Sequence, residues 1–267
     1  MTVTNLKLCK LASRIKTNIS LFGFAQVDNT WNGTILSPQN SRLYYITKGS
    51  ATILLKNGRE IELSPKNWVL LPSGCTFDFC CEEQMEHVFF HLQICTFNEI
   101  DLLKSCKEPI FLNDPDFNYS KIIEYLTCQD TLSSLYIHQF VENTIFKLLD
   151  ANEIFLEEKK LSPCVASAIN YINSNLSAKL TLQEILDSTF TSKSTLTKNF
   201  KNELGISVHQ YIVDKIMSEI EQLLHQSEMS IGEISDKYNF YDQFYFSKCF
   251  KKRYGISPVE YRKTKII

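Results

Sequence analysis

The chain has 267 residues, of which 44% are apolar and 22% are charged, as is typical of a folded globular protein. This length indicates one large or two modest domains, and no run of eighteen apolar residues predicts a membrane span. The formal net charge of −2 excludes a uniformly basic nucleic-acid coat protein. It does not exclude DNA binding, which depends on local phosphate contacts.

The two halves of the chain differ slightly in charge. Residues 1–161 contain 15 Lys and Arg against 19 Asp and Glu, whereas residues 162–267 contain 13 against 11. The sign of this difference suits a nucleic-acid-binding module in the second half. The start of the chain lacks the basic and apolar pattern of a signal peptide, and the nine cysteines form no C-x-x-C pair. We therefore expect a cytoplasmic protein whose cysteines are mostly buried as small apolar side chains.

Residues 41–93 have the pattern of short strands separated by turns. The β-prone runs are residues 43–47, 52–55, 60–63, 68–71, 76–80 and 87–94. Asn57-Gly58 predicts a tight hairpin between the second and third runs. The near-regular spacing of strands and turns predicts a small barrel or sandwich.

From about residue 116 the apolar spacing becomes that of helices. Ile122, Ile123 and Leu126 indicate one helix, and residues 135–149 indicate a longer amphipathic helix. The longer helix either forms a dimer surface or packs against its own barrel, and the pattern supports both equally. The charged stretch 150–163 ends in Ser-Pro and predicts an interdomain linker.

The remainder of the chain is predicted to be helical. Thr181 with Glu184, and Ser230 with Glu233, have the spacing of capping boxes at helix starts. Ser192 and Asp242 are expected to cap two further helices, which end at Gly205 and Gly255. Residues 208–226 predict one continuous helix, roughly 28 Å long at about 1.5 Å per residue.

A repeat with an offset of fifty residues connects these helices. Six positions of a twelve-residue frame are identical in the two copies, Phe200-Lys201-x-x-x-Gly205-Ile206-Ser207-x-x-x-Tyr211 and Phe250-Lys251-x-x-x-Gly255-Ile256-Ser257-x-x-x-Tyr261. Self-similarity at a fixed offset indicates one structural unit built twice. Each copy is short and helical and has a basic end, which points to two DNA-reading modules.

A helix-turn-helix unit places its second helix in the major groove, and two units on one DNA face must present these helices about 34 Å apart. The continuous helix between the repeats has nearly this length. The polar residues on the outer faces of the two reading helices are the candidate DNA contacts: Ser192, Lys193, Ser194, Thr195, Thr197, Lys198, Lys201, Gln243, Tyr245, Ser247, Lys248, Lys251, Lys252 and Arg253.

Their side chains suit different parts of the duplex. Gln can pair with adenine and Lys with guanine, whereas Lys251, Lys252 and Arg253 near a helix end are expected to contact phosphates. A plainer alternative is that these polar faces are simply solvated. The repeat, the two capping boxes and the connector length favour DNA binding.

The second unit resembles the AraC/XylS-type transcription regulators. The resemblance is carried by Ile231-x-Glu233-Ile234, Phe240, Phe246-Ser247, Phe250-Lys251, Gly255-Ile256-Ser257-Pro258 and Tyr261-Arg262. It covers residues 166–263 strongly and residues 42–93 more weakly. In that family, the base-contacting positions correspond to Ser194, Thr197, Lys198, Gln243, Tyr245, Ser247 and Lys248.

The chain departs from the family pattern in both bracing helices and both turns. Leu186 and Ser235 stand where the family usually has Ala, and Phe190 and Asn239 stand where it usually has Gly. Ile216 replaces a usual Arg near the middle of the connector. Asn tolerates the left-handed conformation of such a turn, whereas Phe adopts it at a cost.

The resemblance implies an α+β fold with an N-terminal cupin-like β-barrel. The expected domains are a sensor barrel in 1–115, a helical dimerisation or linker region in 116–161, and a double helix-turn-helix domain in 162–267. The implied function is that of a sequence-specific transcription regulator, more often an activator than a repressor. Double-stranded DNA, RNA polymerase, a small effector and a second copy of the chain are the implied partners, and no membrane, metal or other cofactor is implied.

Several aromatic side chains of the barrel region could line an effector pocket. The candidate effector residues are Trp31, Tyr44, Trp68, Phe77 and His91, although most of the aromatic side chains are expected to form plain core. A regulator without a small ligand, controlled by a partner protein or by abundance, is the alternative.

A metal-dependent barrel enzyme is the rival class of function. His87 and His91 would lie on one face of a strand, but two ligands are too few for a metal site. We therefore expect no catalytic residues.

Overall fold

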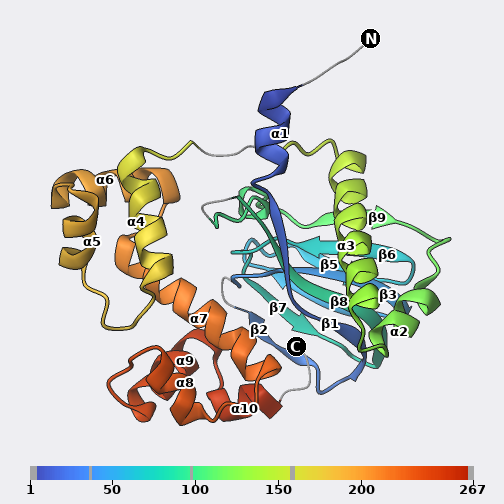
Figure 1. Ribbon diagram of the computed structural model, residues 1–267. Helices are drawn as coiled ribbons and strands as arrows, with labels where there is room; N and C mark the ends of the chain where they lie inside the picture. The colour runs from blue at the N-terminus through green and yellow to red at the C-terminus, as the bar shows by residue number, and fades with distance from the viewer. Residues whose placement is uncertain (1–4, 36–37, 97–98, 157–159, 264–267) are drawn as a thin grey trace. The chain divides into compact units, whose positions relative to one another are not determined.

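The computed structural model describes residues 5–35, 38–96, 99–156 and 160–263. The chain divides into two compact units, Met1–Glu157 and Glu158–Lys265. The first unit consists mainly of antiparallel sheets and the second is helical (Figure 1), which confirms the predicted α+β class. No described helix is long and apolar enough to cross a membrane.

Among the described residues of the first unit, nine strands form two antiparallel sheets, and a short helix, α1 (Leu6–Ala12), comes before them in the chain. The first sheet has the order β1 (Lys16–Asp28), β8 (Gln84–Cys95), β3 (Ser41–Gly49), β6 (Asn67–Leu71) and β9 (Ile110–Asn113). The second has the order β2 (Asn32–Ile35), β7 (Phe77–Cys80), β4 (Ala51–Leu55) and β5 (Glu60–Leu63). The six predicted strands are therefore present, and β1, β2 and β9 extend the sheets beyond the predicted region.

The hairpin predicted at Asn57-Gly58 joins β4 to β5. Gly58 has a φ of 82°, and the N–H of Gly58 donates to the carbonyl of Leu55 at 2.9 Å. A positive φ in this tight turn is the reason for glycine at this position.

The central strands of the first sheet, β3, β6 and β8, are buried on both faces. Leu43, Tyr45, Trp68 and Phe90 lie in one core cluster with the apolar side chains of two helices, α2 (Tyr119–Leu126) and α3 (Thr131–Ala151). The segment predicted as a separate helical region therefore packs on the sheet as part of the first unit (Figure 1).

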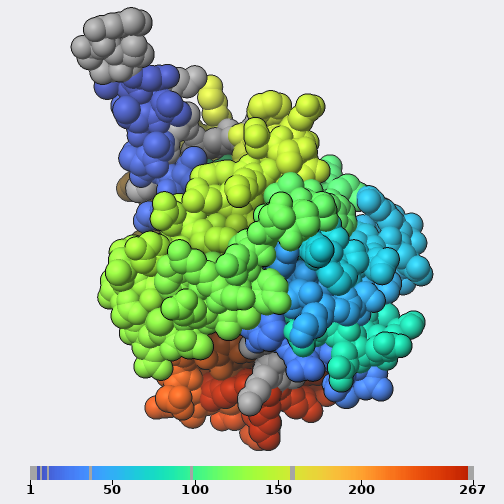
Figure 2. Space-filling view, turned by 90° about the vertical axis from the view of Figure 1, so that its right-hand side faces the viewer, coloured from blue at the N-terminus to red at the C-terminus, as the bar shows by residue number. Residues whose placement is uncertain are grey.

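Helix α3 also has an outer face, and it lies on the outside of the first unit (Figure 2). Leu135, predicted in the apolar stripe of this helix, is 61% exposed, and Leu132 and Phe146 are 59% and 55% exposed. The other residues predicted in this stripe, among them Val141 and Ile145, are buried.

The opposite face of the first sheet carries polar side chains between apolar ones. Arg42, Tyr44, His87 and His91 alternate along β3 and β8 with the residues of the helix-facing core, and all four are buried. Because successive side chains of a strand point to opposite faces, these four point away from α2 and α3.

The cysteines do not follow the expectation that most are buried. Only Cys81 and Cys95 are buried, and Cys9, Cys80 and Cys128 are exposed. Cys80 and Cys81 differ because neighbouring residues at the end of β7 alternate between the outer and inner faces.

The second unit has seven helices within residues 160–263. They are α4 (Pro163–Ser174), α5 (Leu182–Thr189), α6 (Lys193–Leu204), α7 (Val208–Gln226), α8 (Ile231–Lys237), α9 (Gln243–Tyr254) and α10 (Pro258–Lys263). Both predicted capping boxes are present, at Thr181 with Glu184 and at Ser230 with Glu233. Each box satisfies backbone N–H groups that the first turn of a helix otherwise leaves without partners.

Two buried groups of the first unit should make opposite contributions to pH-dependent stability. Burial lowers the pKa of His87 from 6.5 to about 4, so stability is lost as pH falls from 6.5 to about 4. Burial raises the pKa of Asp101 from 3.8 to about 6, despite hydrogen bonds from Ser73 and two backbone N–H groups, so stability is gained as pH falls from 6 to 3.8. Each effect amounts to about 3 kcal/mol.

Because the two effects on stability oppose each other, replacing one of the two residues should make the pH dependence caused by the other measurable. Between pH 6.5 and 4, the free energy of unfolding of Asp101→Asn should fall about 3 kcal/mol more than that of the wild type. That of His87→Phe should fall about 3 kcal/mol less over the same range. Urea denaturation at each pH measures both differences, and parallel profiles for the three proteins would contradict the assignment.

Candidate nucleic-acid interface

Two helix pairs repeat the same local construction. In α5–α6 and in α8–α9 the first helix begins with a capping box, and the second is capped by a side-chain oxygen, from Ser192 and Asp242 respectively. Both second helices end at a glycine in the left-handed conformation, Gly205 with a φ of 75° and Gly255 with a φ of 82°. The repeat in the sequence is therefore a repeat of caps as well as of side chains.

The turns inside the two pairs also match. Phe190 and Asn239 both adopt the left-handed conformation, with φ values of 50° and 55°. The side chain of Phe190 is 96% exposed, so packing does not offset the cost of this conformation. Ser235, the counterpart of a usual Ala, is 1% exposed, as a close approach of α8 to its neighbours requires.

Each second helix buries one apolar stripe and turns its polar face to solvent. Leu196 and Phe200 of α6, and Phe246 and Phe250 of α9, are completely buried. Burial of each such side chain stabilises the unit by about 1.5–3 kcal/mol. This packing fixes which residues of α6 and α9 face outward.

The structure exposes most of the predicted DNA contacts. The exposed ones are Ser192, Lys193, Ser194, Thr195, Thr197, Lys198 and Lys201 around α6, and Gln243, Tyr245, Lys248, Lys251 and Lys252 on α9. The hydroxyl of Thr197 donates to the carbonyl of Lys193 at 2.8 Å, which leaves its oxygen as an acceptor. Ser247 is half-buried.

Arg253 differs from the other predicted contacts. Its Nη1 lies 3.0 Å from Oδ1 of Asp214 on α7, and both side chains are mostly buried. The guanidinium therefore joins α9 to the connector helix, because a carboxylate within hydrogen-bonding distance is a stronger partner than water. This contact between helices was not expected from the sequence, and the phosphate contact of Arg253 stays a prediction.

The connector α7 has 19 residues and spans about 28 Å, and one helix pair lies at each end of it (Figure 1). Its acidic side chains accept hydrogen bonds from the second pair and from α10. Tyr238 donates to Glu219 at 2.9 Å, and Tyr261 donates to Glu221 at 2.8 Å. At the other end, the rings of Phe200 and Tyr211 make an edge-to-face contact with centroids 5.6 Å apart.

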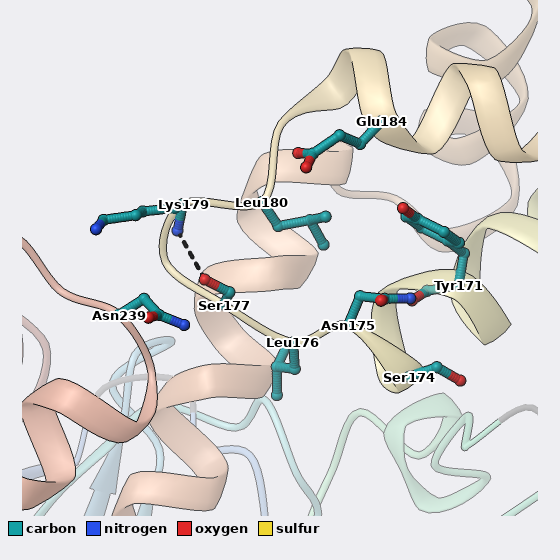
Figure 3. Close-up of a pocket in the computed structure, with 9 residues that line it drawn as sticks. All are labelled: Tyr171, Ser174, Asn175, Leu176, Ser177, Lys179, Leu180, Glu184 and Asn239. Carbon is teal, nitrogen blue, oxygen red and sulfur yellow. Dashed lines mark hydrogen bonds between the residues drawn. The ribbon is translucent and has the colours of Figure 1, made fainter.

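A second link joins the two helix pairs outside α7. The N–H of Ala178, in the loop between α4 and α5, donates to the carbonyl of Tyr238 at the end of α8 at 2.8 Å. Beside this link lies an open hollow of about 410 Å³, lined by residues that include Tyr171, Leu180 and Asn239 (Figure 3). The spacing of the two pairs is thus held by the helix and by this loop.

The sequence interpretation omitted two exposed aromatic side chains at the start of α9. Tyr241 and Phe244 are each 88% exposed and were not among the expected DNA contacts. The available signal was their position next to the cap Asp242 and outside the apolar stripe of Phe246 and Phe250.

Four of the five candidate effector residues lie between the two sheets. The ring of Trp31 lies 4.5 Å from that of Phe79 and 6.2 Å from that of His87, and the ring of His87 lies 5.4 Å from that of Tyr44. Phe77 contacts Phe79 at 6.5 Å between centroids, and the ring of His91 contacts that of Phe89, the neighbour of His87, at 5.7 Å.

Trp68 is separated from the other four. It pairs with Tyr45 and lies in the core that faces α2 and α3. The prediction that it lines the same site is therefore wrong, because Trp68 and Tyr44 point to opposite faces of one sheet.

The same space contains a buried polar cluster of Arg42, Tyr44, His87 and His91. Nη1 of Arg42 lies 3.0 Å from Nδ1 of His91. Burial raises the pKa of Tyr44, although Arg42 opposes this through its charge and a hydrogen bond. Among the described residues, Nδ1 of His87 has no hydrogen-bond partner and no group of three or more His, Cys, Asp or Glu could hold a metal ion.

Comparisons with known proteins agree with this geometry. Residues 185–264 match the family described as "Helix-turn-helix domain". The chain is 28% identical over 127 residues to the probable transcriptional regulator LumQ of Photobacterium leiognathi, covering 47% of this chain and 51% of LumQ. It is 33% identical over 100 residues to the multiple antibiotic resistance protein MarA of Escherichia coli, covering 38% of this chain and 79% of MarA.

A solved structure extends the likeness to the whole fold. ToxT from Vibrio cholerae superposes with a TM-score of 0.60 at 17% identity, over 93% of this chain and 98% of that chain. Other structures of ToxT contain an unsaturated fatty acid or (E)-4-(8-methylnaphthalen-1-yl)but-3-enoic acid. The chain spans about half the length of LumQ.

Two matching helix pairs with outward polar helices on one connector define a double helix-turn-helix DNA-binding protein, here with an additional β unit. The chain covers 79% of MarA at 33% identity, and this match identifies the family within that class. The chain belongs to the AraC/XylS-type family of transcription regulators.

The position of Arg253 leads to a test on neighbouring residues. Arg253→Gln should lower the free energy of unfolding by about 1–3 kcal/mol, because Asp214 loses a charged partner. Lys252→Gln is the matched control, since Lys252 is exposed and should change stability by less than about 0.5 kcal/mol. Chemical denaturation of both variants measures this, and equal stabilities would refute the structural role of Arg253.

Proposed function

We propose that this chain is a sequence-specific transcription regulator that places α6 and α9 in successive major grooves on one face of DNA. The observation that carries the proposal is the pair of equivalent helices, each turned outward by the same buried stripe and joined by α7. The connector length of about 28 Å is of the order of the helical repeat of DNA, about 34 Å. A single chain then presents two reading helices without needing a symmetric dimer.

The exposed residues divide into two roles along each reading helix. The N-terminal part of a recognition helix reaches base edges, and a Lys there can bond to guanine. Lys248 lies nearer that part of α9, whereas Lys252 lies in the last turn, where a side chain meets phosphates more easily.

These roles predict different effects of two Lys substitutions. Lys248→Ala should relax the preference at one base pair, at a cost of about 1–3 kcal/mol for the preferred base. Lys252→Ala should weaken binding to all sequences alike and reduce the slope of log K against log salt by about 0.9. Titrations of the full chain with sequences selected from a random DNA pool, at several salt concentrations, measure both effects.

Two outcomes would count against this assignment at different levels. Identical behaviour of the two variants would overturn the division of roles. Absence of any sequence-selective binding by the wild type at moderate salt would contradict the proposed function itself.

The family membership favours activation, in which the DNA-bound protein contacts RNA polymerase. A homodimer is part of the same proposal, and the outer face of α3 supports it. Leu132, Leu135 and Phe146 are more than half exposed on this helix, where a second copy could cover them.

We further infer that a small carboxylic acid with an apolar body controls the regulator by binding between the two sheets. Arg42 is 4% exposed there, next to Tyr44 and His91. A guanidinium is permanently charged and its forked donors match a carboxylate. The rings of Trp31 and Phe79 offer apolar surface for the rest of the molecule. The acids contained in the ToxT structures are of this class.

This effector class can be tested by thermal stabilisation. A medium-chain fatty acid at a hundred times its Kd should stabilise the protein by about 2.7 kcal/mol, and the corresponding alcohol should not. Arg42→Gln should abolish the effect. Lys48→Gln, which alters an exposed base on the same strand, should retain it.

Other outcomes of this screen favour the competing proposals. Equal stabilisation by acid and alcohol would refute the role of Arg42. A regulator without a small ligand is the alternative, and it is supported if no acid stabilises the protein while DNA binding persists.

A further inference from the structure

The two reading helices have the same outward ridge except at one position. On α9 the ridge consists of Phe244, Lys248 and Lys251, which share one face because they are four and three residues apart. Fifty residues earlier, the equivalent ridge of α6 consists of Ser194, Lys198 and Lys201. All six residues are exposed. The lysines are therefore common to both helices, and the leading residue distinguishes them.

Phe244 has no structural task in the second unit. It is 88% exposed and makes no ring contact with any aromatic side chain in the described part of the chain. The core of this helix pair is instead formed by Phe240, Phe246 and Phe250. Single exposed apolar residues are common, so exposure alone does not indicate a binding role. The position of Phe244 does.

The position is the second residue of α9, immediately after the cap Asp242 and Gln243. This first turn of a recognition helix is the part that reaches the base edges. An aromatic ring at this point, with Lys248 one turn behind it, projects from the same face as the basic side chains.

The major groove limits what such a ring can recognise. The base-edge groups that it displays are hydrogen-bond donors and acceptors, the small C5–H of cytosine and the C5-methyl group of thymine, which is the largest apolar group among them. Phenylalanine has no hydrogen-bonding group in its side chain. Contact between this ring and the methyl group of thymine would therefore favour binding. At the other bases the ring would remove water from polar groups without offering them a hydrogen bond, which disfavours binding.

We propose that Phe244 determines sequence specificity by contacting the C5-methyl group of thymine in the half-site read by α9. Ser194 gives α6 no such preference, so the two half-sites differ at this position. This inference rests on the proposed DNA-binding function and deepens it. It explains why a duplicated module on one chain would recognise two different half-sites.

The experiment removes the methyl group without changing base pairing. A DNA site is first selected from a random pool with the full wild-type chain, and each thymine is then replaced singly by deoxyuridine. For the wild type, one or two replacements should weaken binding about three- to fivefold, the effect expected for one buried methyl group. Phe244→Ala should bind the thymine and deoxyuridine sites equally well.

Two further variants make the test specific. Phe155→Ala is the matched control, because Phe155 is also 88% exposed and lies in the first unit, and this variant should keep the wild-type sensitivity to the methyl group. Ser194→Phe should acquire sensitivity to an additional thymine in the half-site read by α6. Because both altered positions on α6 and α9 are exposed, the variants should retain the melting temperature of the wild type.

The failures of the two proposals are distinguishable. Selective DNA binding that no deoxyuridine replacement weakens would overturn the role of Phe244 and leave the DNA-binding function intact. Unchanged methyl sensitivity in Phe244→Ala would also overturn it. Absence of selective binding by the wild type would overturn both.

Discussion

The spacing of the two reading helices depends on how α7 is held to the second helix pair. Asp214, Glu219 and Glu221 of α7 lie within the unit, where a carboxylate without partners would cost several kcal/mol. Each accepts from a donor outside α7: Arg253, Tyr238 and Tyr261. Tyr254 of α9 also donates to Glu221, at 3.4 Å. Burial raises the pKa values of Tyr238 and Tyr254, so both phenols remain protonated donors near neutral pH. A connector held in this way transmits a fixed distance and rotation between α6 and α9.

The repeated units show which features of a reading module tolerate change. The caps, the terminal glycines and the buried stripe are shared, because each is required by the backbone or by packing. The outward lysines of the ridge are shared as well, whereas its leading position differs between Ser194 and Phe244, because solvent accepts both side chains. A substitution at such a position changes the DNA sequence that the helix prefers without changing how the helix packs. Two copies of one fold can therefore bind two different DNA segments.

One sheet of the first unit packs an apolar face against two helices and carries buried polar side chains on its other face. The side of β3 and β8 that carries Leu43, Tyr45 and Phe90 contributes to the core under α2 and α3. The other side of the same strands carries Arg42, Tyr44, His87 and His91. A rigid core on one side keeps the polar groups on the other in place, which is the arrangement that ligand recognition requires.

The sequence by itself determined the local features of this protein. Caps such as Thr181 with Glu184, the hairpin at Asn57-Gly58 and the helical repeat were all predicted, because each follows from interactions between residues close together in the chain. The polar faces of α6 and α9 were also predicted, since helical periodicity separates them clearly from the buried stripe.

Only the tertiary structure decided which features face one another. Strands β3 and β6 are buried on both faces, so they lack the alternation that would have separated Trp68 from Tyr44. The contact of Arg253 with Asp214 could not be predicted, because Asp214 lies on another helix, thirty-nine residues earlier in the chain. The exposure of Phe244 could not be predicted for a related reason. An aromatic residue is expected in the core, and only the structure shows that Phe246 and Phe250 occupy the core of this helix pair.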